Sequence, residues 1–247
     1  MQAATLSSTW IHHKHRFVLA CLMVTSIFVW ISVGVQANSG TSLGYQAIHH
    51  HFMMQTIGLG LALVCTVYMY KYFFLTTKTY LRIGNLTSHV RAEPMIHLRP
   101  RRKDHWTFIG IDGTIIVAVV SILVMHVPRI VYNGLQSDMM IKILPIAIVF
   151  SFINSFTEEI LMRLGMIVSL KGIVSERKIP LICGLVYGCT QYWFAPGGFL
   201  GVITGVALGW FLAKSVLETR GLFWAWLIHF VRDVVVYSSF FSLSFAG

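Results

Sequence analysis

Long apolar runs, rather than alternating polar and apolar positions, dominate the hydrophobic pattern of this chain. Several runs approach the roughly 17–25 residues that a helix needs to cross the hydrocarbon core of a bilayer. The period-2 alternation of a membrane β-barrel is missing from them. The pattern therefore predicts an all-α, polytopic helical membrane bundle of about seven transmembrane spans. The predicted spans are residues 17–35, 53–73, 108–127, 141–168, 179–194, 198–213 and 221–243, each to within a few residues.

Composition supports a membrane protein and excludes an ordinary soluble domain. Of the 247 residues, 56% are hydrophobic and only 11% are charged, whereas soluble domains carry about 25% charged residues. All four cysteines lie in apolar runs, without Cys-x-x-Cys spacing. They are therefore interpreted as packing residues and not as a disulfide framework or a metal site.

The distribution of charge predicts the topology. A formal net charge of +10 would suggest a nucleic-acid partner in a soluble protein. On the seven-span topology, however, nearly all basic residues outside the spans fall on one side, and only Arg129 and Lys142 fall on the other. The positive-inside rule then predicts a multi-pass protein of the cell membrane with a cytoplasmic N-terminus. The basic linker at about 76–107 is expected to lie along anionic lipids, and no nucleic-acid partner is expected.

That linker divides the chain into two predicted parts. Residues 1–107 hold two N-terminal spans plus the basic cytoplasmic linker, and residues 108–247 form a five-span core. The first run, which ends near Val35-Gln36-Ala37, also has features of a signal peptide, but its apolar length favours an uncleaved span. Ionisable residues at membrane depth usually mark function, and they are confined to the second part. We therefore expect any site to belong to residues 108–247.

The fourth predicted span carries an acidic motif, SFINSFTEEILMRLGMIV. On an α-helix Glu159 and Arg163 are four residues apart, in the orientation that favours an ion pair. Glu158 points away from Arg163 and shares a face with Asn154, one turn earlier, and with Ser151 beyond it. Glu158 is therefore the candidate general base, with its neighbour already neutralised. The alternative that these residues form only a buried structural network stays open.

The seventh and fifth predicted spans carry further polar residues at helical spacing. His229 and Asp233 are four residues apart, so the carboxylate is expected to orient the imidazole. Arg232 is a candidate partner for Asp112, Glu158 or Asp233. In the fifth span Tyr187 and Gln191 share a face. An amide such as that of Gln191 can donate and accept hydrogen bonds, but it is not a base at neutral pH and is a poor zinc ligand.

Two smaller patterns are interpreted structurally. Four glycines recur every four residues in the sixth span and predict a ridge for close helix packing: Gly197, Gly201, Gly205 and Gly209. Three consecutive histidines, His49 to His51, are expected to form a solvated cluster in an outer loop, because consecutive side chains diverge.

The order of these motifs resembles the CPBP family of intramembrane proteases. The order is Glu158-Glu159-x-x-x-Arg163, then aromatic-x-x-x-polar, then a glycine-rich span, then His229-x-x-x-Asp233. This family is also called the Abi or CAAX-protease family, and the resemblance covers roughly residues 141–240. It implies a multi-helix membrane core and an endopeptidase that cleaves a membrane-associated peptide or lipidated protein with glutamate-activated water. By resemblance, Glu158 would activate the water, supported by Glu159 and Arg163.

The resemblance also implies the remaining roles. His229 with Asp233 would orient the water or stabilise the oxyanion. The predicted catalytic residues are Glu158, Glu159, Arg163, Gln191, His229 and Asp233. The predicted substrate-binding residues are Asn154, Tyr187 and Arg232.

One departure from the family pattern concerns the metal. The second family motif usually reads Phe-x-x-x-His, but here it is Tyr187-x-x-x-Gln191. A glutamine amide can hydrogen-bond a developing oxyanion, but it cannot replace an imidazole on zinc. No metal ligand and no cofactor is therefore predicted, and the zinc that the family's metalloprotease label implies is disfavoured.

Two alternatives to an active protease stay open. The first is a catalytically silent CPBP-like membrane protein that acts in bacteriocin self-immunity or regulation, and Gln191 favours it. The second is a transporter or channel that uses the buried charges as a proton relay.

Overall fold

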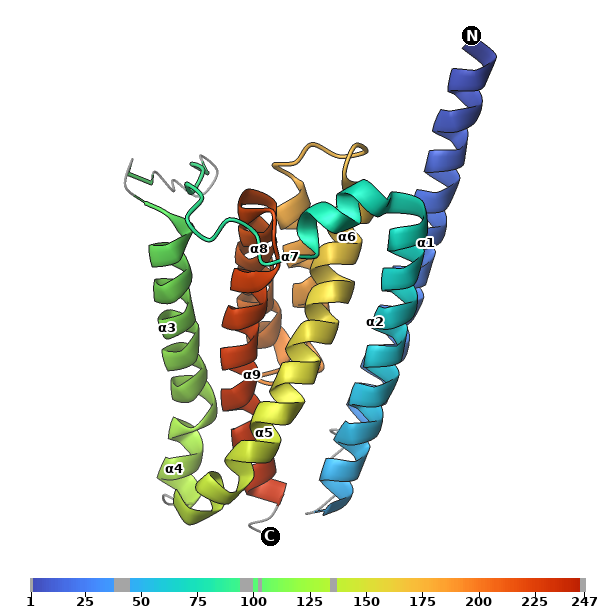
Figure 1. Cartoon of the computed structure of the whole chain (residues 1–247). Helices are drawn as coiled ribbons and strands as arrows, with labels where there is room; N and C mark the ends of the chain where they lie inside the picture. The colour runs from blue at the N-terminus through green and yellow to red at the C-terminus, as the bar shows by residue number, and fades with distance from the viewer. Residues whose placement is uncertain (1, 38–44, 94–99, 102–103, 134–136, 245–247) are drawn as a thin grey trace.

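The computed structural model describes residues 2–37, 45–93, 100–101, 104–133 and 137–244. In these residues the named elements are all helices, which confirms the predicted all-α bundle (Figure 1). In chain order they are α1 (Gln2–Ala37), α2 (Tyr45–Tyr80), α3 (Trp106–Met125), α4 (Val127–Asn133), α5 (Ser137–Glu158), the π-helix η2 (Glu159–Gly165), α6 (Met166–Leu170), α7 (Ile179–Thr190), α8 (Gly198–Thr219) and α9 (Phe223–Ser244).

Five helical stretches among the described residues are long and apolar enough to cross a membrane. They are His13–Val35, Ile48–Tyr80, Trp106–Met125, Ile141–Leu170 and Gly198–Thr219. The other two predicted spans are also helical, but α7 has 12 residues, a length of about 18 Å that falls short of the hydrocarbon core. α9 has 22 residues, and its charged and polar side chains lower its hydropathy. The protein is thus a multi-pass helical membrane protein.

The helices are arranged so that the basic connections lie together. The N-terminus and the connections after α2, α6 and α8 lie at one end of the bundle, and the C-terminus lies at the other (Figure 1). This arrangement agrees with the predicted sidedness, while the cytoplasmic placement of the N-terminus stays a prediction. Residues 94–99 and 102–103, which hold much of the basic linker, lie outside the described residues. Contact of the linker with anionic lipids also stays a prediction.

The described part of the linker is docked on the end of α8. Lys214, only 2% exposed, lies 2.9 Å from the Glu93 carboxylate and also pairs with Glu218. The indole N–H of Trp106 donates to the other Glu218 oxygen at 2.8 Å. A buried ionic cluster therefore holds the linker at its middle, through Glu93, and at its C-terminal end, through Trp106. This contact was not predicted from the sequence.

The glycines of α8 form the predicted packing ridge against α7. A Cβ atom at Gly205 would lie 2.9 Å from the Cα of Gly188, and one at Gly209 would lie 3.1 Å from the Cα of Gly184. The two backbones therefore touch, which confirms the prediction of close helix packing. Gly197 stands apart from the ridge, because it is the N-cap of α8 with φ of 78°.

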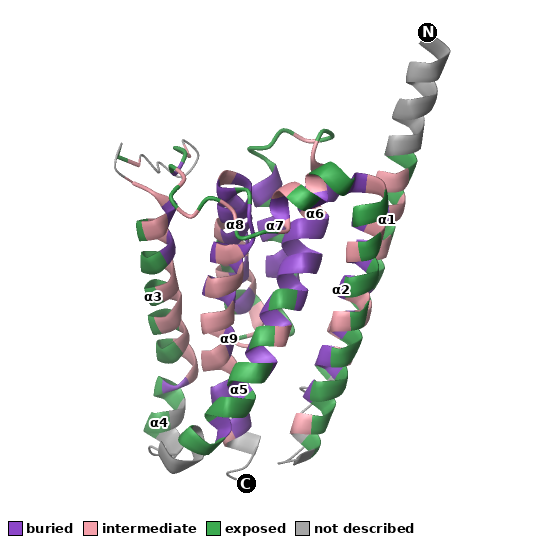
Figure 2. Cartoon of the chain, viewed as in Figure 1, coloured by how far each residue is buried: buried purple, intermediate pink, exposed green. Residues whose placement is uncertain are grey.

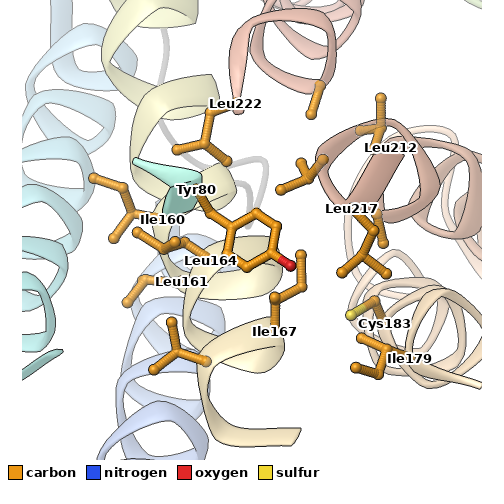
Figure 3. Packing of buried hydrophobic residues seen from close by; sticks show 14 of the residues in the cluster. Tyr80, Ile160, Leu161, Leu164, Ile167, Ile179, Cys183, Leu212, Leu217 and Leu222 are labelled. Atoms are coloured by element: carbon orange, nitrogen blue, oxygen red, sulfur yellow. The ribbon is translucent and has the colours of Figure 1, made fainter. Parts of the chain in front are cut away.

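The largest apolar core surrounds η2 and α6. Side chains from α2, η2, α6, α7 and α8 meet there, and Figure 3 shows Tyr80 at the centre of a group that includes Leu164 and Leu217. Figure 2 shows that the segment from η2 to α6 is almost wholly buried, whereas α3 has much exposed surface. The acidic motif is therefore held in the most densely surrounded part of the bundle.

The expectation for the consecutive histidines is wrong for His51. These residues lie in α2 and not in a loop. His49 is exposed, but His51 is 3% exposed and makes edge contacts with the rings of Tyr237 and Phe241. Helical geometry explains the difference, because it turns one of three consecutive side chains toward the neighbouring helix.

Candidate active site

The acidic motif lies where the helix changes type. α5 ends at Glu158 and the π-helix begins at Glu159; such i→i+5 segments are rare and are frequent at functional sites. At its far end, a Cβ atom on Gly165 would lie 2.3 Å from the terminal carbon of Met23. The end of the Met23 side chain, from α1, therefore fills the space beside Gly165 behind the acidic motif.

His229 of α9 lies at the centre of the polar cluster. Its Nδ1 is 2.8 Å from Glu159 Oε1, and its Nε2 is 3.4 Å from Glu158 Oε2. The two adjacent carboxylates thus approach the imidazole at different nitrogens. Asp233 was predicted to orient this ring, but it lies 3.6 Å from Nε2, and Glu159 holds Nδ1. Because a carboxylate accepts there, Nδ1 carries a hydrogen and Nε2 faces Glu158.

Arg163 balances Glu159 through charge. The pair is separated by 3.4 Å, with the side chains 0% and 1% exposed. The guanidinium also lies 4.1 Å from the centroid of the Tyr187 ring. In the described residues its nitrogens have no hydrogen-bond partner, so a cation–π contact and the ion pair hold it. Tyr187, predicted to bind substrate, is buried between Arg163 and His229, with its hydroxyl 3.2 Å from Nε2.

Asn154 joins two carboxylates from different helices. Its Nδ2 donates to Glu158 Oε1 at 2.7 Å and to Asp233 Oδ2 at 2.9 Å. The predicted shared face of Asn154 and Glu158 is thus observed. Ser151, which was placed on the same stripe, donates to the Ala147 carbonyl at 2.6 Å. Asn154 therefore acts on the carboxylates themselves rather than as a residue exposed for substrate.

Arg232 has Asp233 and Gln191 as partners. It donates to Asp233 Oδ1 at 2.9 Å, to Gln191 Oε1 at 2.9 Å and to the Ala195 carbonyl at 3.0 Å. Of the three carboxylates considered from the sequence, Asp233 is the one that it contacts, and Asp112 is exposed on α3. Gln191, the C-cap of α7, is thus bound to a cation.

The charges of the cluster leave room for one proton. Three carboxylates and two guanidiniums are gathered around one imidazole. Buried charge is costly unless it is balanced, and one further proton balances this set. His229 is placed to carry it, because its Nδ1 faces Glu159 and its Nε2 faces Glu158 and Asp233. Glu158 Oε2 has no hydrogen-bond partner in the described part of the chain, so it is available to a water molecule or a substrate.

Two cavities meet at the Gln191–Arg232 contact. The smaller, of about 80 Å³, is lined by Glu158, Asn154 and Asp233, and also by Trp30 and His51 from the N-terminal helices. This volume accommodates water. The larger, of about 380 Å³, is mostly apolar and lies among α3, α8 and α9. Gln191 and Arg232 line both cavities, so the apolar space lies directly beside the polar one.

The donor set does not fit a zinc ion. Ligand atoms of Glu158, His229 and Asp233 lie within 4.8 Å of one another. This set holds a single imidazole, however, and Asp233 Oδ1 already accepts from Arg232. A dication would compete with that guanidinium for the same oxygen, and known catalytic zinc sites mostly use two or three His or Cys ligands.

Two polar residues of the site, Gln55 and Tyr237, were not predicted from the sequence. Gln55 of α2 donates to Asn154 Oδ1 at 3.1 Å and to the Tyr237 hydroxyl at 2.7 Å. The sequence contains a feature that could have indicated each of them. Tyr237 continues the four-residue spacing of His229 and Asp233, and Gln55 is an isolated amide in an apolar run. The N-terminal helices therefore also contribute to the site, which was expected only within residues 108–247.

The fold and the site define a multi-pass helical membrane protein with a buried acid–imidazole centre. Residues 140–235 match the family model described as type II CAAX prenyl endopeptidase Rce1-like. This match confirms the resemblance to the CPBP family over these residues. Comparisons with curated proteins and with solved structures give no match. Gln55 and Tyr237 lie outside the matched residues.

Proposed function

We propose that this protein is an intramembrane endopeptidase in which Glu158 activates a water molecule. The proposal depends mainly on the surroundings of the Glu158 Oε2 atom. It is buried, lacks a hydrogen-bond partner in the described residues, faces His229 Nε2 at 3.4 Å and borders a cavity large enough for water. A family match to endopeptidases over the same residues supports it.

The chemistry follows from the contacts of Glu158. Asn154 occupies Oε1, so Oε2 is the oxygen that takes a proton from water as the water attacks the peptide carbonyl carbon. The C–N bond then breaks, and Glu158 returns the proton to the leaving amine. General base catalysis of this kind contributes about 10²–10⁴-fold to the rate. Glu159, held by Arg163, fixes the imidazole from its far side, so that Nε2 stays directed at the reacting atoms.

Arg232 and Gln191 are proposed to act on the substrate side of the cavity. Arg232 places a fixed positive charge beside Asp233, where it favours negative charge that develops on the substrate carbonyl oxygen. The adjoining apolar cavity would take the apolar part of a membrane-associated or lipidated substrate, which agrees with the prenyl group in the family description. We propose a cytoplasmic N-terminus and a linker on anionic lipids as the setting.

A matched pair of carboxylate variants tests this function. Glu158→Gln removes the base and keeps the size of the side chain, whereas Glu176→Gln changes an exposed carboxylate paired with Lys171. Membrane-associated peptides from cells that express each variant are compared by mass spectrometry with those from the wild type. We expect cleavage products to vanish only with Glu158→Gln, at equal amounts of folded protein. Unchanged products with this variant would rule out the mechanism.

A catalytically silent role in self-immunity or regulation is the second candidate. The observation that favours it is Gln191, which stands where the family has an imidazole and is bound by Arg232. In this case Glu158→Gln and His229→Ala leave the cellular phenotype intact, while Gly205→Leu, which disrupts helix packing, abolishes it. Loss of the phenotype with all three variants would argue against the silent role.

A further inference from the structure

Tyr237 presents a rigidly held hydroxyl group at the small cavity. It lies one helical turn beyond Asp233, is 6% exposed and lines the cavity that Glu158 also lines. Its ring packs on Phe241 at 5.7 Å and Phe150 at 6.0 Å between centroids. These contacts hold the ring in place, so the position of the hydroxyl oxygen does not depend on a substrate.

The direction of the hydrogen bond between Gln55 and Tyr237 follows from the neighbouring groups. Asn154 must turn its NH₂ group to the carboxylates of Glu158 and Asp233, which only accept. The Asn154 oxygen therefore faces Gln55, whose NH₂ group donates to it at 3.1 Å. The same nitrogen supplies its second hydrogen to the Tyr237 oxygen at 2.7 Å. The opposite orientation of Gln55 would bring two carbonyl oxygens together.

This orientation is maintained at a cost. The Gln55 carbonyl oxygen is buried and has no hydrogen-bond partner among the described residues. An unsatisfied buried acceptor is unfavourable, so the contacts of the NH₂ group determine how the amide lies. The Tyr237 oxygen is consequently an acceptor toward Gln55, and its own hydrogen is left for another acceptor. In the described residues Gln55 is the hydrogen-bond partner of this hydroxyl, and the cavity is where a further acceptor can enter.

We propose that Tyr237 is a catalytic residue that donates this hydrogen to the substrate carbonyl oxygen as negative charge develops on it, with Gln55 as its positioning residue. This inference rests on the proposed endopeptidase function. It adds a hydroxyl donor to a site that carries the amide of Gln191, whose oxygen accepts from Arg232, in place of an imidazole at position 191. Removal of one donor to an oxyanion lowers kcat by about 10²–10³-fold in a known protease.

The first test is Tyr237→Phe in the purified full-length protein, because phenylalanine keeps the ring contacts. The probe is a prenylated CAAX-type peptide that carries a fluorophore and a quencher. We expect kcat to fall by about 10²–10³-fold, with KM nearly unchanged and the melting temperature preserved. The matched control is Tyr192→Phe, at an exposed tyrosine outside the cavities. Wild-type kcat in Tyr237→Phe would overturn the inference.

A second measurement separates donation from a structural role. Replacement of Tyr237 by fluorinated tyrosines makes the phenol a progressively stronger donor without removing the ring. We expect kcat to follow the donor strength of the phenol across this series. The same kcat for all the fluorinated tyrosines would overturn the inference. Gln55→Ala should lower kcat in the wild type but add little to Tyr237→Phe, because contacting residues couple; equal losses in both backgrounds would contradict the positioning role.

These outcomes are distinct from failure of the proposed function. If Glu158→Gln cleaves the probe as fast as the wild type, or if the wild type does not cleave it, the endopeptidase proposal fails. If Glu158→Gln is inert while Tyr237→Phe is fully active, only the inference about Tyr237 fails.

Discussion

The buried pair of Glu159 and Arg163 allows the electrostatics of the site to be measured without a substrate. Arg163→Met removes the charge and keeps an unbranched apolar side chain in its place. The two side chains are 1% and 0% exposed, so the Glu159 carboxylate would be left buried without its counter-ion. Removal of one partner from such a pair costs about 3–5 kcal/mol. We expect the free energy of unfolding to fall by this amount.

The double variant shows whether charge is the cause. The Arg163 nitrogens have no hydrogen-bond partner in the described residues, so little hydrogen bonding is lost with them. In Arg163→Met combined with Glu159→Gln no charge is left unpaired, and the glutamine oxygen can still accept from His229. The remaining cost is the cation–π contact with Tyr187, about 2 kcal/mol for a desolvated pair. We therefore expect the double variant to be more stable than Arg163→Met alone.

Equilibrium unfolding in mixed detergent micelles measures these free energies. Glu176→Gln is the control, because it breaks an ion pair whose side chains are 36% and 51% exposed. Such surface pairs contribute about 0–1 kcal/mol. A loss below about 1 kcal/mol for Arg163→Met, or simple addition of the two single effects in the double variant, would show that an unpaired buried charge is not the cause.

Three further predictions concern packing, the linker and metals. Gly205→Leu should reduce the amount of folded protein, because a Cβ atom there would lie 2.8 Å from a Gln191 side-chain carbon and 2.9 Å from the Gly188 Cα. The control is Gly60→Ala, which should be tolerated because nothing lies within 4 Å of a Cβ atom there. The yield of monodisperse protein after detergent extraction measures both effects. Lys214→Met should speed tryptic cleavage in the linker, since the buried lysine holds Glu93; an unchanged digestion rate would contradict this docking. Chelators such as 1,10-phenanthroline should leave cleavage unaffected. Loss of activity with the chelator and its recovery with zinc would show that cleavage depends on a bound metal.

Helix periodicity predicted which side chains of one helix act together. Asn154 with Glu158, and Glu159 with Arg163, were paired from their spacing and are in contact in the structure. Contacts between helices did not follow from spacing. The imidazole of His229 is held by Glu159 because α9 packs against α5, and that helix changes from α to π at Glu159. Periodicity within one helix predicts neither this packing nor the change of helix type.

The contribution of the N-terminal helices was also beyond the sequence pattern. Gln55 was passed over because a single uncharged amide does little to the hydropathy of a long apolar run. Its role depends on α2 packing against α5, which brings it to Asn154. Tyr237, in contrast, could have been found, since it lies four residues after Asp233 on the same face of α9.

The role of Glu158 as the base that activates water is tested most directly by hydrolysis of the prenylated peptide in ¹⁸O-labelled water, with purified wild type and Glu158→Gln. We expect the wild type to place one labelled oxygen in the new carboxylate, and Glu158→Gln to form product at least about 10²-fold more slowly. Product formation by Glu158→Gln at the wild-type rate would show that Glu158 is not the base.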